Sequence, residues 1–390
     1  MKWINKTPDG TINAIEMTLN RRQSHMLTAT IIISFFIYCS ILSKANILPH
    51  LSSSTSRFKH IDGLRGLAAV LVVCAHSWRI SQVGFINDNV LTYHQYNANL
   101  GAIGVQIFFC ITGFLFTRKA LTDKNINWNN FFLSRIKRLV PLYVLFFLLL
   151  ITISLFIVNK VDVNFSIQSF KMLTLGLMGS DYILTGENLS HLTSILWTLP
   201  YEIKFYIALP ALCAAISTRR SFLISTLFIF IFAAASLYIY SFNAWIYFII
   251  GGVTAFLNEK HILVNLLKKH ANVIFIFSAI IILYSSFLVV DKYGYIRFVF
   301  MSFFFPVVVL SSPSMLKSKA LSFMGEISYS IYLIHILIIF LVTKFLSLFF
   351  ANYHASDFVS LSLMSLCCLA ICIICSLTFK YVEYPFLRRK

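Results

Sequence analysis

Residues 61–76 of the chain are IDGLRGLAAVLVVCAH, an apolar stretch of helical length that carries one fixed cation and one titratable ring. Arg65 and His76 are eleven positions apart, so at 3.6 residues per turn they share a helix face and lie roughly 16 Å apart along the axis. On a membrane-spanning helix this places Arg65 near one surface and His76 about halfway across. Ionisable groups at that depth cost free energy, which makes the pair a candidate functional site.

The composition of the whole chain excludes a soluble protein. Of its 390 residues, 58% are hydrophobic and 12% are charged, and the mean hydropathy is +0.81. Only lipid can cover that much apolar surface in a chain of this size. The apolar runs are long and do not alternate, so backbone groups would be satisfied within helices rather than in a barrel. We predict an all-α fold, a polytopic transmembrane helical bundle.

The apolar runs predict about ten core helices and one extra helix before them. The extra helix is a stretch at 27–42, either spanning or interfacial, and residues 159–199 are expected to form an outer loop that partly re-enters. The chain then divides into an N-terminal segment with its linker, residues 1–56, and a transmembrane domain, residues 57–390. The core runs lie at 65–82, 99–117, 139–158, 200–217, 221–240, 243–258, 272–290, 296–313, 327–349 and 358–379.

The net charge of +18 fits a membrane protein better than a nucleic-acid-binding protein. The cations fall in short loops between the apolar runs, as the positive-inside rule requires. With ten spans, every strongly basic loop falls on the cytoplasmic side, and so does the C-terminus. These cytoplasmic cations are Arg118, Lys119, Lys124, Arg135, Lys137, Arg138, Arg219, Arg220, Lys260, Lys268, Lys269, Lys317, Lys319, Arg388, Arg389 and Lys390.

The cysteines and the common motifs point away from metal chemistry. All eight cysteines lie inside apolar runs, where they are typical small packing residues, and we predict no metal site. No glycine-rich phosphate loop, zinc-binding HExxH or GxSxG motif is present.

His76 and Arg65 suggest the chemistry of group transfer. His76 is the side chain on its helix that can take a proton near neutral pH, so it suits a general base acting on a hydroxyl. Arg65, near the cytoplasmic entrance, suits a phosphate-bearing donor. The alternative is an arginine that extends to the interface and a histidine bonded within the bundle.

Two further motifs lie in the next two apolar runs. Small residues at 101, 104 and 113 allow close helix approach, while Gln106 and Thr112 are candidates to line a polar cavity. Arg135 and Arg138 precede a membrane entry point. They form either a cytoplasmic anchor or a docking site for an anionic cofactor.

Polar side chains also enter two later runs. Trp197 and Glu202 lie where the outer loop enters a span, and Glu202 can accept a hydrogen bond from a sugar hydroxyl or orient a histidine. Ser328, Tyr332 and His335 follow i, i+4, i+7 spacing and share a face. The last motif, residues 382–386, is interpreted as a helix terminus.

Taken in order, these motifs resemble the acyltransferase-3 family of membrane O-acyltransferases. The resemblance spans residues 57–390. It rests on Arg65 with His76, Gly104-Val105, Phe108-Phe109, Thr112-Gly113-Phe114, Trp197 to Glu202, Phe205-Tyr206, Ser328-Tyr329, Tyr332, His335, Glu383 and Pro385-Phe386. The basic motif of the family aligns on Ser134, Arg135 and Arg138, so its first cation is a serine here, and that contact is missing or supplied by Lys137.

The resemblance implies ten core helices, acetyl-CoA used from the cytoplasm, and acylation of an extracytoplasmic or membrane-linked saccharide. His76 and Glu202 would be catalytic, and Arg65, Arg135 and Arg138 would hold the CoA phosphates. Thr112 and Gln106 would line the cavity or contact substrate, together with Trp197, Tyr332 and His335. The chain continues seven residues past Glu383, as in the stand-alone form of the family.

We therefore predict a multi-pass bacterial inner-membrane O-acetyltransferase that acts on a surface or lipid-linked saccharide of the O-antigen or lipopolysaccharide type. Its expected partners are acetyl-CoA, the saccharide acceptor and membrane lipids, with no nucleic acid. The alternatives are transfer of another acyl group such as succinyl, and a non-enzymatic transporter of lipid-linked sugar. The acetyl route requires Arg65 and His76 to open into one common cavity.

Overall fold

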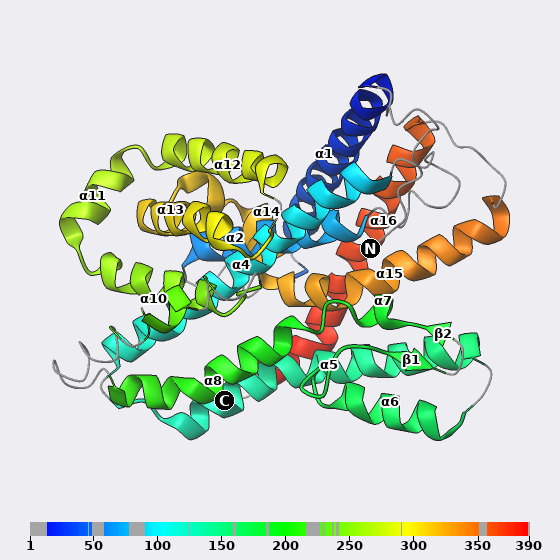
Figure 1. The fold of residues 1–390 in the computed structure, drawn as a ribbon, viewed down its shortest axis with the longest axis horizontal. Helices are drawn as coiled ribbons and strands as arrows, with labels where there is room; N and C mark the ends of the chain where they lie inside the picture. The colour runs from blue at the N-terminus through cyan, green and yellow to red at the C-terminus, as the bar shows by residue number, and fades with distance from the viewer. Residues whose placement is uncertain are drawn as a thin grey trace.

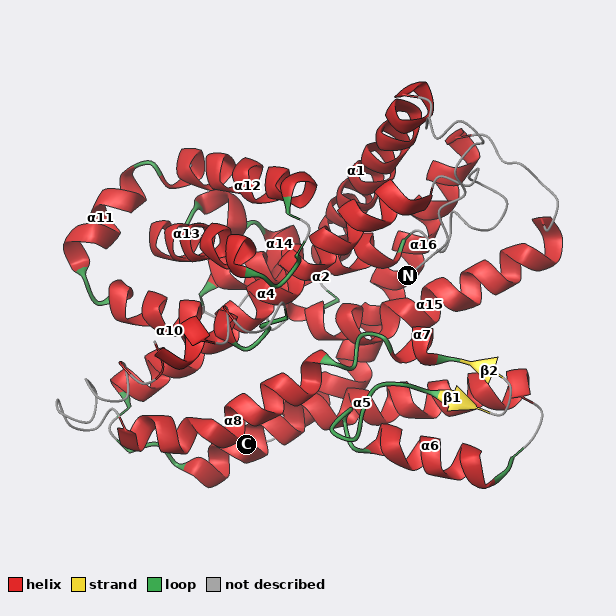
Figure 2. Cartoon of the chain, in the orientation of Figure 1, coloured by secondary structure: helices red, strands yellow, loops and turns green. Residues whose placement is uncertain are grey.

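The structure is a computed structural model in which the chain folds almost entirely into helices (Figure 2). It describes residues 14–45, 47–48, 58–77, 90–123, 125–158, 161–184, 187–215, 227, 229, 231–235, 238, 242–289, 291–350 and 357–388. Within these ranges, the one sheet is a two-residue antiparallel pairing of β1 (Ile183–Leu184) with β2 (Glu187–Asn188). The all-α prediction is confirmed.

The helices that carry the fold are arranged as Figure 1 shows, with α4 near the centre and α5, α6 and α8 together on one side. In chain order they are α1 (Ala14–Lys44), α2 (Lys59–His76), α4 (Val90–Thr122), α5 (Trp128–Val158), α6 (Val163–Leu173), α7 (Ser190–Thr193), α8 (Thr198–Ala215), α10 (Ile246–Asn258), α11 (His261–Lys269), α12 (Ala271–Leu288), α13 (Tyr295–Ser311), the 3₁₀ turn η2 (Ser314–Lys317), α14 (Lys319–Glu326), α15 (Ser328–Phe350), α16 (Asp357–Thr378), the π-helical turn η3 (Phe379–Glu383) and α17 (Tyr384–Arg388).

Six helical segments of the described chain are long and apolar enough to cross a membrane, by length and composition. They are His25–Lys44, Tyr96–Thr122, Trp128–Val158, Ala271–Leu288, Ser328–Leu348 and Phe358–Arg388. Shorter apolar helices lie at Ile246–Asn258 and Tyr295–Ser311. The expected run at 221–240 lies mostly outside the described residues, so the count of ten core helices stays a prediction.

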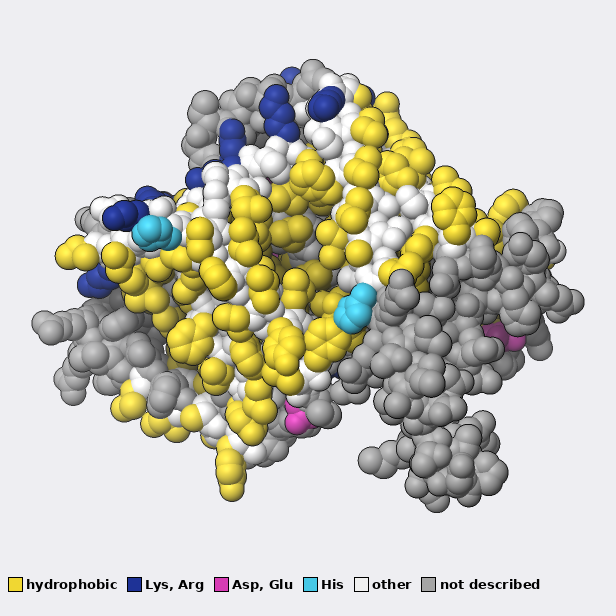
Figure 3. All heavy atoms as spheres, turned by 90° about the horizontal axis from the view of Figure 1, so that it is seen from above, with side chains coloured by type: hydrophobic (Ala, Val, Ile, Leu, Met, Phe, Trp, Pro, Cys, Tyr) yellow, Lys and Arg dark blue, Asp and Glu magenta, His cyan; other side chains and the backbone are white. Residues whose placement is uncertain are grey.

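The surface of the molecule matches this composition. Figure 3 shows a face on which hydrophobic side chains cover most of the described surface, while Lys and Arg gather along one edge. Ile207 on α8, Phe277 on α12 and Phe303 on α13 are each more than three-fifths exposed, at 65%, 64% and 71%. Exposed apolar helix faces of this kind are stable against lipid. The chain is a multi-pass membrane protein.

The extra N-terminal helix predicted at 27–42 is present as part of α1. It packs against α16, where Ser34 Oγ donates to Ser365 Oγ at 3.0 Å and Cys39 Sγ lies 3.8 Å from Cys372 Sγ. Phe35, also on α1, is fully buried. The polar segment before residue 14 and the linker at 51–56 lie outside the described residues.

Residues 161–197 contain no helix of spanning length in their described part, in line with the predicted outer loop. Asp162 caps α6, since its Oδ1 accepts a hydrogen bond from the backbone amide of Phe165 at 2.7 Å. Turns, the β1–β2 hairpin and α7 then lead into α8. The turn includes Gly176 and Leu175, both at positive φ.

Helix α4 is packed tightly between α2 and α10. A Cβ atom on Gly104 would lie 2.5 Å from the carbonyl oxygen of Ala68 on α2. On the other side, a Cβ on Gly113 would lie 2.1 Å from the Phe248 oxygen of α10, and one on Gly251 would lie 2.0 Å from the Cys110 oxygen. The predicted use of the small residues on α4 for close approach is confirmed, because backbone meets backbone at these points.

Two neighbouring glycines on α10 give a direct test of this packing. Gly251→Ala is expected to lower the free energy of unfolding in detergent by about 2–3 kcal/mol, because the new methyl group meets backbone that cannot rotate away. Gly252→Ala is the matched control, since its Cβ would meet only the Thr117 side chain, at 3.2 Å. Thermal unfolding followed by size-exclusion chromatography measures both. Equal stability of the two variants would refute the close α4–α10 contact.

A buried arginine joins α13 to α4 and α12. The Arg297 side chain is fully buried, and it donates from Nη1 to Ser285 Oγ at 2.6 Å and from Nη2 to Asn99 Oδ1 at 2.8 Å. Asn99 in turn donates to the carbonyl oxygens of Ser286 and Val289. These bonds give both terminal nitrogens of the buried guanidinium a partner, and they fix α12 and α13 beside α4.

Candidate active site

A cavity of about 270 Å³ opens between α2, α4, α5, α8 and α15. Its polar lining includes three arginines, Arg65 from α2 with Arg135 and Arg138 from α5. Phe108, Phe109 and Phe116 of α4 line its apolar side. A cavity that combines guanidinium groups with an apolar wall suits a ligand with an anionic end and an uncharged arm.

The three arginines are held by different partners. Arg65 Nη1 lies 3.9 Å from Asp62 Oδ1, one turn earlier on α2. Arg135 donates from Nε to Ser134 Oγ at 3.2 Å, and its guanidinium lies 5.0 Å from the centre of the Phe116 ring. Ser134 therefore orients Arg135, although it cannot supply the cation expected at its position. Lys137 does not line the cavity.

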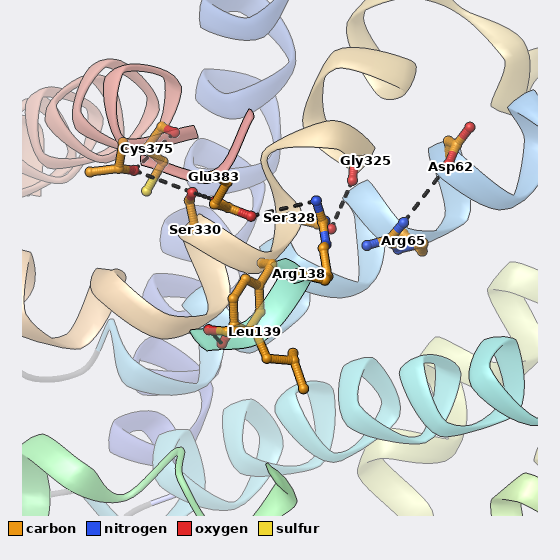
Figure 4. A network of polar contacts seen from close by, with 11 residues as sticks. Asp62, Arg65, Arg138, Leu139, Gly325, Ser328, Ser330, Cys375 and Glu383 are labelled. Carbon is orange, nitrogen blue, oxygen red and sulfur yellow. Dashed lines mark hydrogen bonds and ion pairs between the residues drawn. The ribbon is translucent and has the colours of Figure 1, made fainter. Parts of the chain in front are cut away.

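Arg138 is paired with a carboxylate from the far end of the chain. Its Nη1 lies 3.5 Å from Glu383 Oε2, and Ser330 Oγ donates to Glu383 Oε1. Figure 4 shows the Glu383 carboxylate between Ser330 and Arg138, with Arg65 and Asp62 on a neighbouring helix. Glu383 is fully buried and ends the π-helical turn η3.

Thr112 of α4 and Glu202 of α8 both line the cavity. Glu202 accepts a hydrogen bond from Tyr206 Oη, one turn further along α8. Lys204, two residues further along α8, is exposed, whereas Glu202 is half-buried, so these two charged residues point to different faces. Glu202 therefore belongs to the cavity that the three arginines line, and not to the contact between His76 and His335.

The two sequence-predicted histidines meet although 259 positions separate them. His335 Nε2 lies 3.2 Å from His76 Nδ1, and the ring centres are 5.1 Å apart. His335 is fully buried on α15, while His76 is partly buried at the end of α2. No spacing rule links these positions, since the contact depends on how α2 packs against α15.

The backbone around the pair sets the positions of the ring protons. His335 Nδ1 lies 2.8 Å from the Ile331 oxygen and 2.9 Å from the Tyr332 oxygen. Carbonyls only accept, so this nitrogen carries a proton and Nε2 of a neutral His335 accepts. His76 Nδ1 lies 3.0 Å from the Val72 oxygen and donates by the same argument. Nε2 is then the basic nitrogen of His76.

The histidine pair is joined to the cavity through α15. Tyr332 lines the cavity, and its Oη makes hydrogen bonds of 2.7 Å to Thr198 Oγ1 and 2.8 Å to the Ile195 oxygen. His335 follows three positions later on the same face of α15, and neither His335 nor His76 lines the cavity. Because Tyr332 and His335 share a face of α15, we expect the route from Arg65 to His76 to pass Tyr332, and the opening of Arg65 and His76 into one common space stays a prediction.

Gln106 and Trp197 also lie outside the cavity lining. Gln106 is fully buried and donates from Nε2 to the Lys292 oxygen at 2.7 Å, which joins α4 to the turn before α13. Trp197 packs edge-on against Tyr293 and Phe242, with ring centres 5.6 and 5.4 Å away.

The residue that the sequence interpretation missed is Glu383. Glu383 is part of the sequence resemblance, but residues 382–386 are interpreted there as a helix terminus and Glu383 is given no role in the site, whereas the structure pairs it with Arg138 of the cavity. A carboxylate placed directly after a long apolar run was the available signal, because such a group is rarely buried without a partner.

Comparison with known proteins gives a consistent result. A family model described as an acyltransferase domain matches residues 58–379. A relative in Bacillus subtilis (strain 168), named "Putative peptidoglycan O-acetyltransferase YrhL", is 30% identical over 171 residues, which is 40% of this chain and 24% of the relative.

A second relative is the peptidoglycan O-acetyltransferase OatA of Listeria monocytogenes, 28% identical over 169 residues, covering 39% of this chain and 23% of the relative. The matched part is thus about a quarter of the length of either relative. No solved structure matches the chain.

Proposed function

The chain belongs to the acyltransferase-3 family, and from that premise we propose that it moves an acetyl group from cytoplasmic acetyl-CoA to a hydroxyl of a surface saccharide. The observation that carries this proposal is the contact between His76 and His335 one turn beyond a cavity lined by three arginines. In this proposal the cavity arginines bind the phosphates of the donor, and His76 acts as the base further along the path of the acetyl group. The proposed localisation is the bacterial inner membrane, with the C-terminus cytoplasmic.

The arginines fit the anionic part of the donor. Arg65, Arg135 and Arg138 can bind phosphate oxygens, since guanidinium groups donate two parallel hydrogen bonds to such groups. The pantetheine arm would extend along the phenylalanine wall of α4 toward Tyr332. To reach His76, the thioester would have to pass Tyr332, whose hydroxyl bonds to Thr198.

The chemical step then needs one base and one acceptor hydroxyl. Nε2 of His76 takes the hydroxyl proton while the oxygen forms a bond to the acetyl carbon, and the carbon–sulfur bond breaks. The CoA thiolate leaves and takes the proton from the imidazolium, so an acetyl ester and CoA result. His335 accepts from Nδ1 of His76 throughout and stabilises the imidazolium that forms.

Glu202 would position the acceptor hydroxyl from the cavity side, since its carboxylate faces that space. Thr112 would contact the donor arm or the acceptor as it enters. Gln106 and Trp197 lie behind the cavity wall, and their proposed role is to fix α4 and the start of α8. No metal ion is needed in this scheme.

For the acceptor we propose a glycan of the O-antigen type, whereas both relatives are named for peptidoglycan. The experiment compares cells with and without the chain and measures alkali-labile acetate on surface polysaccharide and on peptidoglycan separately. New acetate on surface polysaccharide is the expected result. Acetate on peptidoglycan alone would overturn the acceptor, and no new acetate or a succinyl ester in its place would overturn acetyl transfer.

A further inference from the structure

We propose that Glu383 is a positioning residue that holds Arg138 toward the phosphates of the donor, with Ser330 fixing the carboxylate. This inference rests on the proposed use of acetyl-CoA. It assigns a role in donor binding to the last helix of the domain, which supplies no arginine to the cavity. Three features of the described residues support this role.

The first feature is the burial of the pair. Glu383 has no exposed surface, and the Arg138 side chain is 16% exposed. A buried carboxylate costs free energy unless a cation and hydrogen-bond donors compensate it. Arg138 supplies the cation at 3.5 Å and Ser330 supplies the donor. Such a pair is retained for the geometry it imposes more readily than for its contribution to stability.

The second feature is how the carboxylate is fixed. Ser330 Oγ donates to Glu383 Oε1 and receives a hydrogen bond from Thr378 Oγ1 at 3.2 Å. The wider π-helical turn η3 follows Thr378, and turns of this kind occur often at functional sites. The carboxylate is therefore held by α15 and α16 together (Figure 4).

The third feature is how Arg138 faces the cavity. Its guanidinium lies 5.9 Å from the centre of the Tyr329 ring and 6.0 Å from that of Phe379, so apolar surfaces flank it. Tyr329 Oη donates to the Leu139 oxygen at 3.0 Å and ties this part of α5 to α15. Glu383 engages one side of the guanidinium, and its remaining donors are available to a ligand in the cavity that Arg138 lines.

Removing Glu383 has two opposing effects on the binding of an anionic ligand. Loss of the negative charge would by itself favour an anionic ligand in the cavity. Loss of the partner would allow Arg138 to rotate toward water, because a long side chain with no fixed partner regains its rotamers. We expect the second effect to dominate, since a phosphate bound by two donors depends strongly on the orientation of the guanidinium.

The test measures binding of CoA and of pantetheine, which lacks the nucleotide and all phosphates, to the purified full-length protein in detergent. Glu383→Gln is expected to weaken CoA binding roughly tenfold and to leave pantetheine binding unchanged. In an Arg138→Gln background the same substitution is expected to have no further effect on CoA. Glu259→Gln, an exposed carboxylate after α10, is the matched control and should match the unaltered protein.

Each other outcome has a defined meaning. Equal weakening for CoA and pantetheine, or an undiminished effect in the Arg138→Gln background, overturns the positioning role. Tighter CoA binding by Glu383→Gln also overturns it and identifies the carboxylate as a competitor for Arg138. If the variant does not fold, Ser330→Ala replaces it, with weakening roughly threefold expected for CoA alone. Failure of the unaltered protein to bind CoA overturns the proposed function itself.

Discussion

The substitution His76→Ala is expected to reduce the rate of acetyl transfer about a thousandfold, because the acceptor hydroxyl then loses the base that takes its proton. The protein is expected to fold normally, since His76 lies partly exposed at the end of α2, where its ring bonds to Val72 and His335. Formation of labelled acetyl ester from acetyl-CoA in membranes with matched protein content measures the effect.

The control for this substitution is His270→Ala. His270 is exposed at the end of α11, well separated in the chain from the cavity residues, and its removal should leave the rate unchanged. CoA binding by the His76 variant should also match that of the unaltered protein, because the arginines are intact. A loss smaller than tenfold would show that another group accepts the proton.

The substitution His335→Ala is expected to lower kcat about 10- to 100-fold and to leave the KM for acetyl-CoA unchanged. His335 is not among the residues that line the cavity, and its Nε2 accepts a hydrogen bond from His76 Nδ1. Without that acceptor, His76 loses both its fixed orientation and the stabilisation of its charged form. Steady-state kinetics with the acceptor glycan at saturation measure the two constants separately.

The conservative variant His335→Gln distinguishes this role from simple packing. Its amide oxygen can accept from His76 Nδ1, so it should recover a substantial part of the kcat that the alanine variant loses. If His335→Gln is as impaired as His335→Ala, or if KM rises while kcat is unchanged, then His335 does not act through His76.

Much of the fold followed from the sequence because membrane helices are nearly local structures. The run at 99–117 appears within α4 and the run at 358–379 within α16, since every backbone group in an apolar helix must bond within it. The close approach of α4 to its neighbours also followed from its small residues. The extent of α2, which begins at Lys59 rather than at residue 65, was less predictable because Asp62 and Arg65 lower the apolar signal of its first turns.

Several residues that line the cavity could be named from the sequence, but the contacts between residues of the site could not. Arg65, Arg135, Arg138, Thr112, Glu202 and Tyr332 line one cavity, and each stands out in the sequence as a polar group within or beside an apolar run. The partners of Arg138 and His76 could not be inferred, because Glu383 and His335 are distant in sequence and meet them only through packing of α15 and α16. Gln106 differs from the lining residues because its amide bonds to the turn before α13 instead.

The glycine contacts of α4 have a consequence for how the donor enters. Backbone-to-backbone contact leaves no compressible layer, so α2, α4 and α10 must move as one body if they move at all. The opposite wall, α5 and α8, meets the rest through longer side chains such as Arg138 and Tyr206, which can change rotamer without breaking a helix. We therefore expect acetyl-CoA to enter and CoA to leave through small movements of α5 and α8. The unit of α2, α4 and α10, which carries His76, would stay rigid during these movements.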